Sequence, residues 1–369
     1  MKKLSVFISL LLFLSVNGFA KKVEKDFVSK MGKTLNIDIR SGGDITVEGW
    51  TEDKIKIVVE YDGPDNADFV DYDYYDGDLN ISVNLFNISD NIDDIHFLIH
   101  VPYKFNIEME SMGGDVSVNN IDGEISGKTM GGDLDFSKIY GVIDMTTMGG
   151  DISLEEAQVD GSLKTMGGDV DFKNVAGNVK GNSMGGDISY KNVKLKTKGG
   201  KVEISTMGGD IEVDEAVDGA IVSTMGGDIT IKNAKKFVKA KTMGGDIELY
   251  AVDGWIKATT MGGNIEAAMV GNVKEGKRNV NLNSMGGDIE LTLPEESSIK
   301  FDLNLRYTKN SSRNYKIETN FPIEIKEDNE WTYRNGNATK TITGSGEVNG
   351  GKNTIKINTT NGNIIIRAK

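Results

Sequence analysis

The sequence predicts an all-β chain: a two-sheet β-solenoid with 18-residue rungs and irregular capping rungs at both ends. A short motif, typified by Thr165-Met166-Gly167-Gly168-Asp169-Val170, occurs ten times, and seven of the nine intervals between its methionines are 18 residues. Apolar and polar residues alternate on either side of the motif, as in strands that bury one face. A fixed period of about 20 residues is typical of repeat architectures, in which each unit packs on its neighbours.

Residues 1–20 are predicted to be a secretory signal peptide. Lys2 and Lys3 precede an apolar run that ends at Val16, and Gly18-Phe19-Ala20 provides a small-residue cleavage site. The run is shorter than the ~20 residues that a membrane-spanning helix needs, which favours cleavage over an uncleaved anchor. No second apolar stretch of that length follows. We therefore expect export to the periplasm, the cell surface or the medium, with no transmembrane segment in the mature chain.

Residues 21–106 are expected to form irregular β rungs. Leu35, Ile37 and Ile39 share one strand face, and Ser41-Gly42-Gly43-Asp44 is the central motif without its methionine, so the array begins by residue 41. Residues 62–78 interrupt the pattern with many aspartates, and we predict an irregular acidic loop there. Strand patterns return at 79–88 and 95–101.

Residues 107–291 are predicted to be the regular solenoid. In one unit Val170 and Phe172 alternate with polar residues, and a second alternating run begins nine residues later at Val179. Each unit should thus contain two short strands and two turns. A left-handed hexapeptide helix would need a small or apolar residue where Asn182 stands. The Gly-Gly-x-Gly-x-Asp order of calcium-binding nonapeptide repeats is absent.

Residues 292–369 are predicted to form irregular and capping rungs. They leave the 18-residue pattern and then recover alternating apolar residues at 355–357 and 364–366. Terminal units of solenoids differ from the others because they cover the core and block edge pairing.

The motifs carry a resemblance to a known family. The chain resembles the bacterial family of putative adhesins that is described as a β-strand-repeat domain of unknown function. The resemblance covers nearly the whole mature chain and implies an exported β-solenoid with no established chemistry. The repeated methionine departs from the polar residue usual in that family. The residues that carry the resemblance are Ser41-Gly42-Gly43-Asp44-Ile45-Thr46-Val47-Glu48-Gly49-Trp50, the strand entering Val101-Pro102, the Gly-Asp-Ile rungs and Thr360-Asn361-Gly362-Asn363-Ile364.

Equivalent residues of rungs stacked about 4.8 Å apart should form ladders. The turn glycines are expected because at least one of each pair should need a positive φ. The aspartate should cap its turn through backbone N–H groups, with weak divalent cation binding along the acidic edge as the alternative. The structural turn residues of the first four motifs are Gly113, Gly114, Asp115, Gly131, Gly132, Asp133, Gly149, Gly150, Asp151, Gly167, Gly168 and Asp169.

Two further ladders follow from the motif. The residue after each aspartate should be buried, and this apolar ladder should be a main source of stability. The methionines should fill a corner as flexible apolar side chains, with a stripe of thioether ligands for Cu(I) as the alternative. The methionines are Met112, Met130, Met148, Met166, Met184, Met207, Met225, Met243, Met261 and Met285.

Candidate metal ligands are few. Asp71, Asp73, Asp76 and Asp78 could ligate Ca²⁺, but the glycine comes one place late for a helix–loop–helix calcium loop and no Glu stands at the twelfth position. His96 and His100 share a strand face about 13 Å apart, at ~3.3 Å per residue, which is too far for a shared ion. The chain has no cysteine, which excludes disulfides, thiolate metal sites and cysteine nucleophiles. We expect no cofactor.

The sequence favours binding over catalysis. The formal net charge of −14 argues against nucleic acid and anionic membranes as partners. No phosphate loop or zinc helix is present, and carboxylates are spread at regular spacing. We predict an exported non-catalytic scaffold that binds an unknown surface ligand, glycan or protein, as an adhesin would. A Ca²⁺-binding acidic module, a purely structural envelope protein and a carbohydrate-active enzyme are the alternatives.

The outward side chains support this prediction because they vary between units while the turns do not. They lie between the two core positions of one strand, and such variation suits recognition by an extended face. These positions are Asp171, Ser189, Glu212, Thr230 and Glu248.

Overall fold

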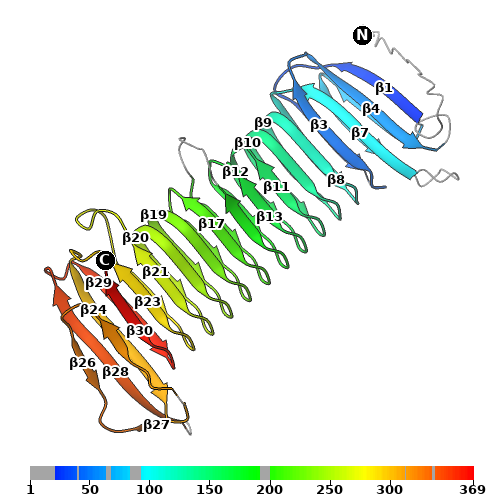
Figure 1. Cartoon of the computed structure of the whole chain (residues 1–369). Helices are drawn as coiled ribbons and strands as arrows, with labels where there is room; N and C mark the ends of the chain where they lie inside the picture. Colours follow the sequence, from blue (N-terminus) through cyan, green and yellow to red (C-terminus); the bar gives the residue numbers. More distant parts are fainter. Residues whose placement is uncertain are drawn as a thin grey trace. The chain divides into compact units, whose positions relative to one another are not determined.

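The computed structural model describes residues 21–39, 41–63, 68–83, 93–191, 200–311, 313–334 and 337–369. These residues form thirty β-strands and no helix, which confirms the all-β prediction (Figure 1). In this part of the chain, no helix is long and apolar enough to cross a membrane. The expected signal peptide, residues 1–20, lies outside the described residues.

The chain divides into two compact units, Met1–Ala176 and Gly177–Lys369. The strands of the first unit are β1 (Lys21–Val28), β2 (Lys33–Ile39), β3 (Asp44–Trp50), β4 (Lys54–Asp62), β5 (Val70–Tyr75), β6 (Asp78–Val83), β7 (Asp93–Pro102), β8 (Phe105–Ser111), β9 (Val116–Thr129), β10 (Leu134–Thr147), β11 (Ile152–Glu155), β12 (Gln158–Lys164) and β13 (Val170–Lys173).

The second unit continues the repeat and ends in longer strands. Its strands are β14 (Val179–Asn182), β15 (Ile188–Lys191), β16 (Val202–Ser205), β17 (Ile211–Ala216), β18 (Ala220–Ser223), β19 (Ile229–Lys241), β20 (Ile247–Thr259), β21 (Ile265–Met269), β22 (Val280–Asn283), β23 (Ile289–Leu293), β24 (Ile299–Thr308), β25 (Ile317–Thr319), β26 (Glu324–Glu327), β27 (Thr332–Arg334), β28 (Asn337–Val348), β29 (Asn353–Thr360) and β30 (Ile364–Ala368).

Successive repeats pair in parallel and in register. Leu134 of β10 lies between Val116 of β9 and Ile152 of β11, each 18 residues away along the chain. Some repeats run as one long strand and others divide the same path in two, since β10 pairs with both β11 and β12, and β19 with both β17 and β18. The repeat is therefore β-solenoid-like.

The predicted apolar ladder is confirmed. Each member is at most 1% exposed, and full burial of an aliphatic side chain contributes about 1.5–3 kcal/mol. The residue two places later, such as Phe172 or Val213, is buried as well, so each outward side chain lies between two core residues. The ladder consists of Val116, Leu134, Ile152, Val170, Ile188, Ile211, Ile229, Ile247, Ile265 and Ile289.

Both ends of the array change from parallel to antiparallel pairing. In the first unit β3 pairs in parallel with β9 and β7, after which β7, β4 and β1 pair antiparallel. In the second unit the chain leaves the array after β23 and returns as β29 and β30, which pair in parallel with β22 and β23. The intervening β24 lies in parallel on β29, and β28 closes it antiparallel.

The predicted acidic loop at 62–78 is wrong for its second half. Residues from Val70 onward form β5, which pairs antiparallel with β6 as a hairpin. Val70, Tyr72 and Tyr74 alternate with exposed Asp71 and Asp73, so the run has the two-residue period of a strand. The density of aspartates concealed this alternation. Of the strand expected at 79–88, β6 supplies 79–83, and 84–88 lie outside the described residues.

Candidate ligand-binding surface

A buried hydroxyl joins consecutive motif turns, by which we mean the Thr/Ser-Met-Gly-Gly-Asp segments. Thr242 is fully buried, and its Oγ1 donates to the carbonyl oxygen of Gly227 in the preceding turn at 2.9 Å. The same oxygen accepts the N–H of Gly245 in its own turn at 3.3 Å. Thr165, Thr206, Thr224, Thr260 and Ser284 make equivalent pairs of bonds. Sequence reasoning missed this role, although Thr or Ser precedes every motif methionine.

The second glycine of each motif is required by close approach to the preceding turn. A Cβ added to Gly227 would lie 2.1 Å from the carbonyl oxygen of Gly209 and 2.5 Å from Asp210 Oδ1. The predicted positive φ occurs at Gly114 and Gly132 but is wrong for the later turns. Their second glycines lie outside the left-handed region and still have no room for a Cβ: Gly150, Gly168, Gly209, Gly227, Gly245, Gly263 and Gly287.

As predicted, the motif aspartates accept backbone N–H groups, but the donor lies in the next turn. Asp228 Oδ1 accepts the N–H of Asp246 at 2.7 Å, and Asp210 Oδ1 accepts that of Asp228 at 2.7 Å. In the first unit Asp115 and Asp133 act in the same way. The donor is therefore a residue 18 places later, which the local sequence around the aspartate does not indicate.

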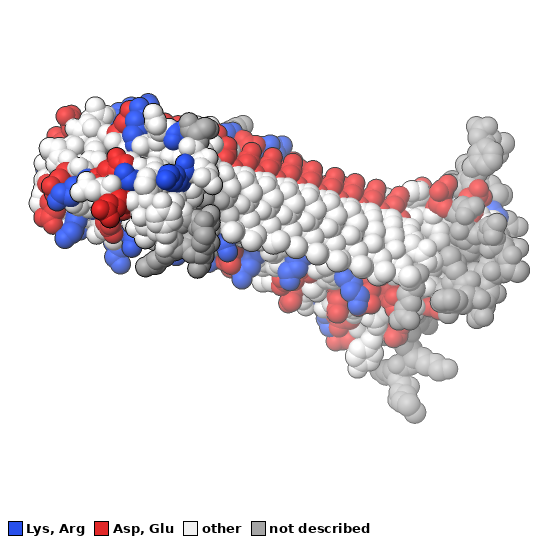
Figure 2. Space-filling view, turned by 90° about the horizontal axis from the view of Figure 1, so that it is seen from below, with Lys and Arg blue, Asp and Glu red and all other residues white. Residues whose placement is uncertain are grey.

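These aspartates form a row of like charges, which we call the carboxylate row. Figure 2 shows it as a line of acidic side chains beside a band of uncharged residues. Burial, with Asp133 and Asp115 nearby, raises the pKa of Asp135 above its usual value. Asn264 fits the row because its amide oxygen accepts the N–H of Asp288 at 2.9 Å, as a carboxylate would.

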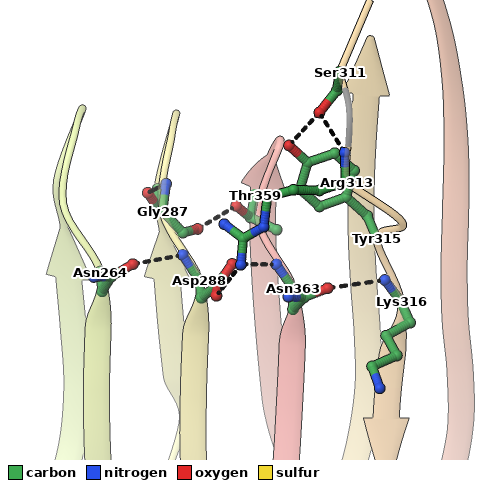
Figure 3. A network of polar contacts seen from close by, with 10 residues as sticks. Asn264, Gly287, Asp288, Ser311, Arg313, Tyr315, Lys316, Thr359 and Asn363 are labelled. Carbon is green, nitrogen blue, oxygen red and sulfur yellow. Dashed lines mark hydrogen bonds and ion pairs between the residues drawn. The ribbon is translucent and has the colours of Figure 1, made fainter. Parts of the chain in front are cut away.

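The carboxylate row ends at a cation and a last amide acceptor (Figure 3). Asp288 Oδ1 accepts the N–H of Asn363 at 2.8 Å, and its Oδ2 lies 3.3 Å from the guanidinium of Arg313. Asn363 Oδ1 then accepts the N–H of Lys316 at 3.1 Å. Thr359 donates to the carbonyl of Gly287 at 2.8 Å, so the closing segment repeats both contacts of a motif turn.

The motif methionines do not fill a corner as expected. All ten are 42–63% exposed. The side chains leave the turn on the solvent side because the Thr or Ser before them points inward to the buried hydroxyl position. We call these ten residues the methionine row.

The four candidate calcium ligands do not converge. Asp71 and Asp73 lie on β5, while Asp76 is in the hairpin turn with φ 49° and pairs with Lys33 at 3.1 Å. Asp78 Oδ1 accepts the N–H of Thr34 at 2.8 Å. Within the described residues, no group of three or more His, Cys, Asp or Glu is placed to hold a metal ion.

The two histidines have separate partners. His96 Nδ1 lies 3.0 Å from Asp44 Oδ2, and His100 Nε2 lies 3.5 Å from Glu48 Oε2. The ring of His100 also packs 5.0 Å from that of Trp50. The structure therefore brings neither histidine to a common site with the other.

One outward face of the second unit carries stacked aromatic rings beside lysines. The rings of Phe237 on β19 and Trp255 on β20 are 5.0 Å apart and nearly parallel, at 12°. Phe237 lies over Gly219, where an added Cβ would be 2.4 Å from the ring. Lys239 and Lys257 follow two residues later on the same strands and pair in register.

Trp255, Lys257 and Lys277 line a shallow depression of about 340 Å³, together with two asparagines, Asn279 and Asn281. The lysine side chains at 239, 257 and 277 are exposed, and none forms an ion pair within the described residues.

Two earlier lysines of β19, Lys232 and Lys236, differ because they have acidic partners. Lys232 lies 2.6 Å from Glu212 and 2.8 Å from Asp214, and Lys236 pairs with Asp218. We call the unpaired set the lysine–aromatic patch: Phe237, Lys239, Trp255, Lys257 and Lys277. Sequence reasoning missed it, because its members are not at motif positions.

A family model agrees with the repeat. The model described as Toastrack DUF4097 matches residues 14–253 and 177–367. The chain belongs to the Toastrack family. The resemblance inferred from the Gly-Asp-Ile rungs is thereby confirmed at the level of a β-repeat domain of unknown function. No match is found among curated proteins.

Solved structures similar to this Toastrack chain are distant. A putative cell adhesion protein from Clostridium sporogenes ATCC 15579 is 14% identical, with 95% of this chain and 100% of that chain covered and a TM-score of 0.19. A putative adhesin from Parabacteroides distasonis ATCC 8503 is 12% identical, with coverage of 74% and 98% and a TM-score of 0.34. A putative lipid binding protein from the same strain is 11% identical, with coverage of 95% and 97% and a TM-score of 0.24. At these scores the likeness carries no argument about function.

Proposed function

We propose that this Toastrack chain is an exported, non-catalytic scaffold that binds an acidic polysaccharide at the cell surface. Residues 1–20 serve as the signal peptide, residues 107–291 as the two-sheet solenoid, and residues 21–106 and 292–369 as its irregular ends. The motif turns, including the twelve residues from Gly113 to Asp169 named above, serve the fold. The outward side chains of the lysine–aromatic patch serve the ligand.

The lysine–aromatic patch is the observation that carries the proposal. An indole face can pack against the C–H face of a sugar ring, and its neighbours supply charge and hydrogen bonds. The amino groups of Lys257 and Lys277 suit carboxylate substituents, since charge-assisted hydrogen bonds are stronger than neutral ones. In a chain of net charge −14, unpaired lysines gathered at one depression favour an anionic ligand there.

The repeat explains how such a ligand would be held. Lys239 and Lys257 stand on neighbouring strands, about 4.8 Å apart, which is close to the length of one sugar ring. A polymer can therefore present successive acidic groups to successive lysines. Turnover would instead need a few groups held in one geometry, and the depression offers amino groups and amides without a carboxylate pair.

The test is binding of the full chain to immobilised polygalacturonate, with dextran as the neutral polymer. Trp255→Ala and the double variant Lys257→Gln/Lys277→Gln should each weaken binding about tenfold or more. The matched control removes the same charge from two ion-paired lysines outside the patch, Lys173→Gln and Lys232→Gln, and should leave binding within a factor of about two.

Three results would contradict the proposal. If the patch variants bind as tightly as the parent chain, the lysine–aromatic patch is not the binding site. Equal affinity for dextran, or for single-stranded DNA at equal charge, would show that the chain does not select an acidic glycan. Depolymerisation of the polygalacturonate would show that the chain is an enzyme and not a non-catalytic scaffold. A Ca²⁺-binding acidic module or a purely structural envelope protein would then be the alternatives to pursue.

A further inference from the structure

The methionine row is exposed, whereas three methionines that lie on strands are buried. Met109, Met145 and Met269 lie on strands and are at most 4% exposed, whereas the ten motif methionines are 42–63% exposed. Exposed thioethers contribute little to a core, because the stabilisation comes from area removed from water. Packing therefore does not account for a methionine in every motif turn.

The turn itself does not require the thioether. In the first and last turns the methionine position is held by Ser41 and Thr360. Both turns keep the backbone contacts of the others: Asp44 Oδ1 accepts the N–H of Asp115 at 2.9 Å, and Asn363 donates to Asp288 at 2.8 Å. A hydroxyl residue at this position is therefore sufficient for the fold. The ten methionines between these two turns need an explanation other than the fold, in their contact with solvent.

Backbone hydrogen bonds hold the methionines in register. The carbonyl oxygen of Met207 accepts the N–H of Gly226 at 3.1 Å, and that of Met225 accepts the N–H of Gly244 at 3.1 Å. The same bond links Met184 to Gly208 and Met243 to Gly262. Consecutive thioethers of the second unit therefore leave the backbone about 4.8 Å apart and on the same side.

We propose that the methionine row binds a soft monovalent cation, Cu(I) or Ag(I), between pairs of consecutive thioethers. Thioethers are ligands that select Cu(I). With a metal–sulfur distance of about 2.3 Å, as in Zn–S bonds, one ion joins two sulfurs about 4.6 Å apart, which is close to the rung spacing. Methionine has three rotatable side-chain bonds, so small adjustments bring both sulfurs to the ion.

The carboxylate row attracts cations electrostatically but does not compete with the thioethers for coordination of a soft cation. Each aspartate follows its methionine by three residues, and one oxygen of Asp210, Asp228 and Asp246 already accepts a backbone N–H. Carboxylates prefer hard cations, whereas their negative potential raises the local concentration of any cation. Two thioethers per ion give about two ions in Met1–Ala176, which has four of the methionines, and about three in Gly177–Lys369, which has six.

The experiment titrates the full chain with Ag(I), and anaerobically with Cu(I) against a chromogenic Cu(I) chelator. We expect about five ions per chain. Of the three pairs of consecutive thioethers expected in Gly177–Lys369, the variant Met207→Leu/Met225→Leu/Met243→Leu keeps one, Met261 and Met285. It should therefore bind about two ions fewer. Leucine keeps the volume, and the urea midpoint checks the fold.

The matched control removes three thioethers elsewhere: Met31→Leu, Met145→Leu and Met269→Leu. It should keep the full number of ions. In a chain with methyl-¹³C methionine, Ag(I) should shift the methyl resonances of the row and leave those of Met109, Met145 and Met269 unmoved.

The proposal fails if the row variant binds as many ions as the parent chain, or if the control loses as many as the row variant. It also fails if Ca²⁺ or Zn²⁺ displaces Ag(I) at equal concentration, which would assign the ions to the carboxylate row. Polygalacturonate binding is measured on the same variants. Because the lysine–aromatic patch is untouched by them, failure of either proposal leaves the other standing.

Discussion

The motif turn contrasts with a second position of the repeat, five residues after the motif aspartate, which we call the second turn. The motif turn uses glycine, yet most of its second glycines have no left-handed φ and are needed because a Cβ would strike the carbonyl of the turn before. The other turn does adopt a left-handed φ, but with side-chain-bearing residues. In the first unit these are Asn120, Lys138, Glu156 and Asn174, with φ of 54–58° at 18-residue intervals.

The difference shows that two separate constraints, close approach of a neighbouring backbone and a left-handed φ, can each favour glycine. At the motif turn the constraint is the distance to a neighbouring backbone, so every unit must keep the glycine. At the second turn the constraint is local strain of about 1–2 kcal/mol, which burial elsewhere in the rung offsets. Asn tolerates this conformation best, whereas Lys138 and Glu156 carry it with no such advantage.

The largest expected effect would come from placing a Cβ at the motif turn. Gly227→Ala should destabilise the second unit by about 3 kcal/mol or more, since the new Cβ would lie 2.1 Å from a carbonyl oxygen. Gly226→Ala is the matched control: its nearest neighbour is at 3.3 Å, and the cost should be at most about 1 kcal/mol. Urea midpoints compare the two. Equal losses would mean that close approach is not the reason for the glycine.

The buried hydroxyl should rank next. Thr242→Val keeps the shape but leaves the carbonyl of Gly227 and the N–H of Gly245 without this partner, at a cost of about 1–3 kcal/mol. Thr242→Ser keeps both bonds, as Ser284 does naturally, and should lose only the methyl contribution of about 1 kcal/mol. A valine variant as stable as the serine variant would argue against the hydrogen-bonded link between turns.

The carboxylate row should show a smaller effect whose sign depends on the replacement. Asp228→Ala removes the acceptor of the Asp246 N–H and should cost about 1–2 kcal/mol. Asp228→Asn keeps an acceptor, as Asn264 does, and relieves repulsion by Asp210 and Asp246, so stability should stay within about 0.5 kcal/mol or rise. Added salt should reduce any gain in stability of the asparagine variant, because salt screens the repulsion between carboxylates in the parent chain. A large loss in Asp228→Asn would contradict the acceptor role.

The smallest effect is expected at the second turn. Lys138→Gly relieves a φ of 54° but raises the entropy of the unfolded chain, so we expect a net gain of up to about 1 kcal/mol. Ser137→Gly, one residue earlier and outside the left-handed region, should lose about 0.5–1 kcal/mol. Thermal unfolding of both variants decides the matter, and a loss at both positions would show that the left-handed φ carries no strain.

The sequence was sufficient to predict an all-β repeat, because the period and the alternation are local signals. The buried ladder from Val116 to Ile289 could be predicted from the residue after each aspartate alone. The roles of individual residues were harder to predict, since the partners of Gly227, Thr242 and Asp228 lie one repeat away. Pair contacts of this kind follow from stacking geometry and not from the residue's own neighbours in sequence.

The candidate binding surface was the least predictable part. Phe237, Trp255 and Lys257 are ordinary strand residues when taken one at a time. Lys277 stands in the extra residues that lengthen one interval to 24, where the repeat gives no guide to position. Only the paired register of β19 and β20, with Lys277 beside them, brings these side chains to one depression. The missed hairpin at β5 has a similar cause, because aspartate content outweighed the alternation.

The motif turn also has a consequence for how such a chain can change in length. Each turn takes its hydrogen-bond acceptors from the turn before it and offers the same set to the turn after it, through Thr242, Asp228 and their equivalents. A tandem, in-frame duplication of 18 codons would therefore supply every partner that the new segment needs. Copy number can drift by replication slippage with no compensating substitution, and each added copy would lengthen the row of thioethers and the row of carboxylates by one.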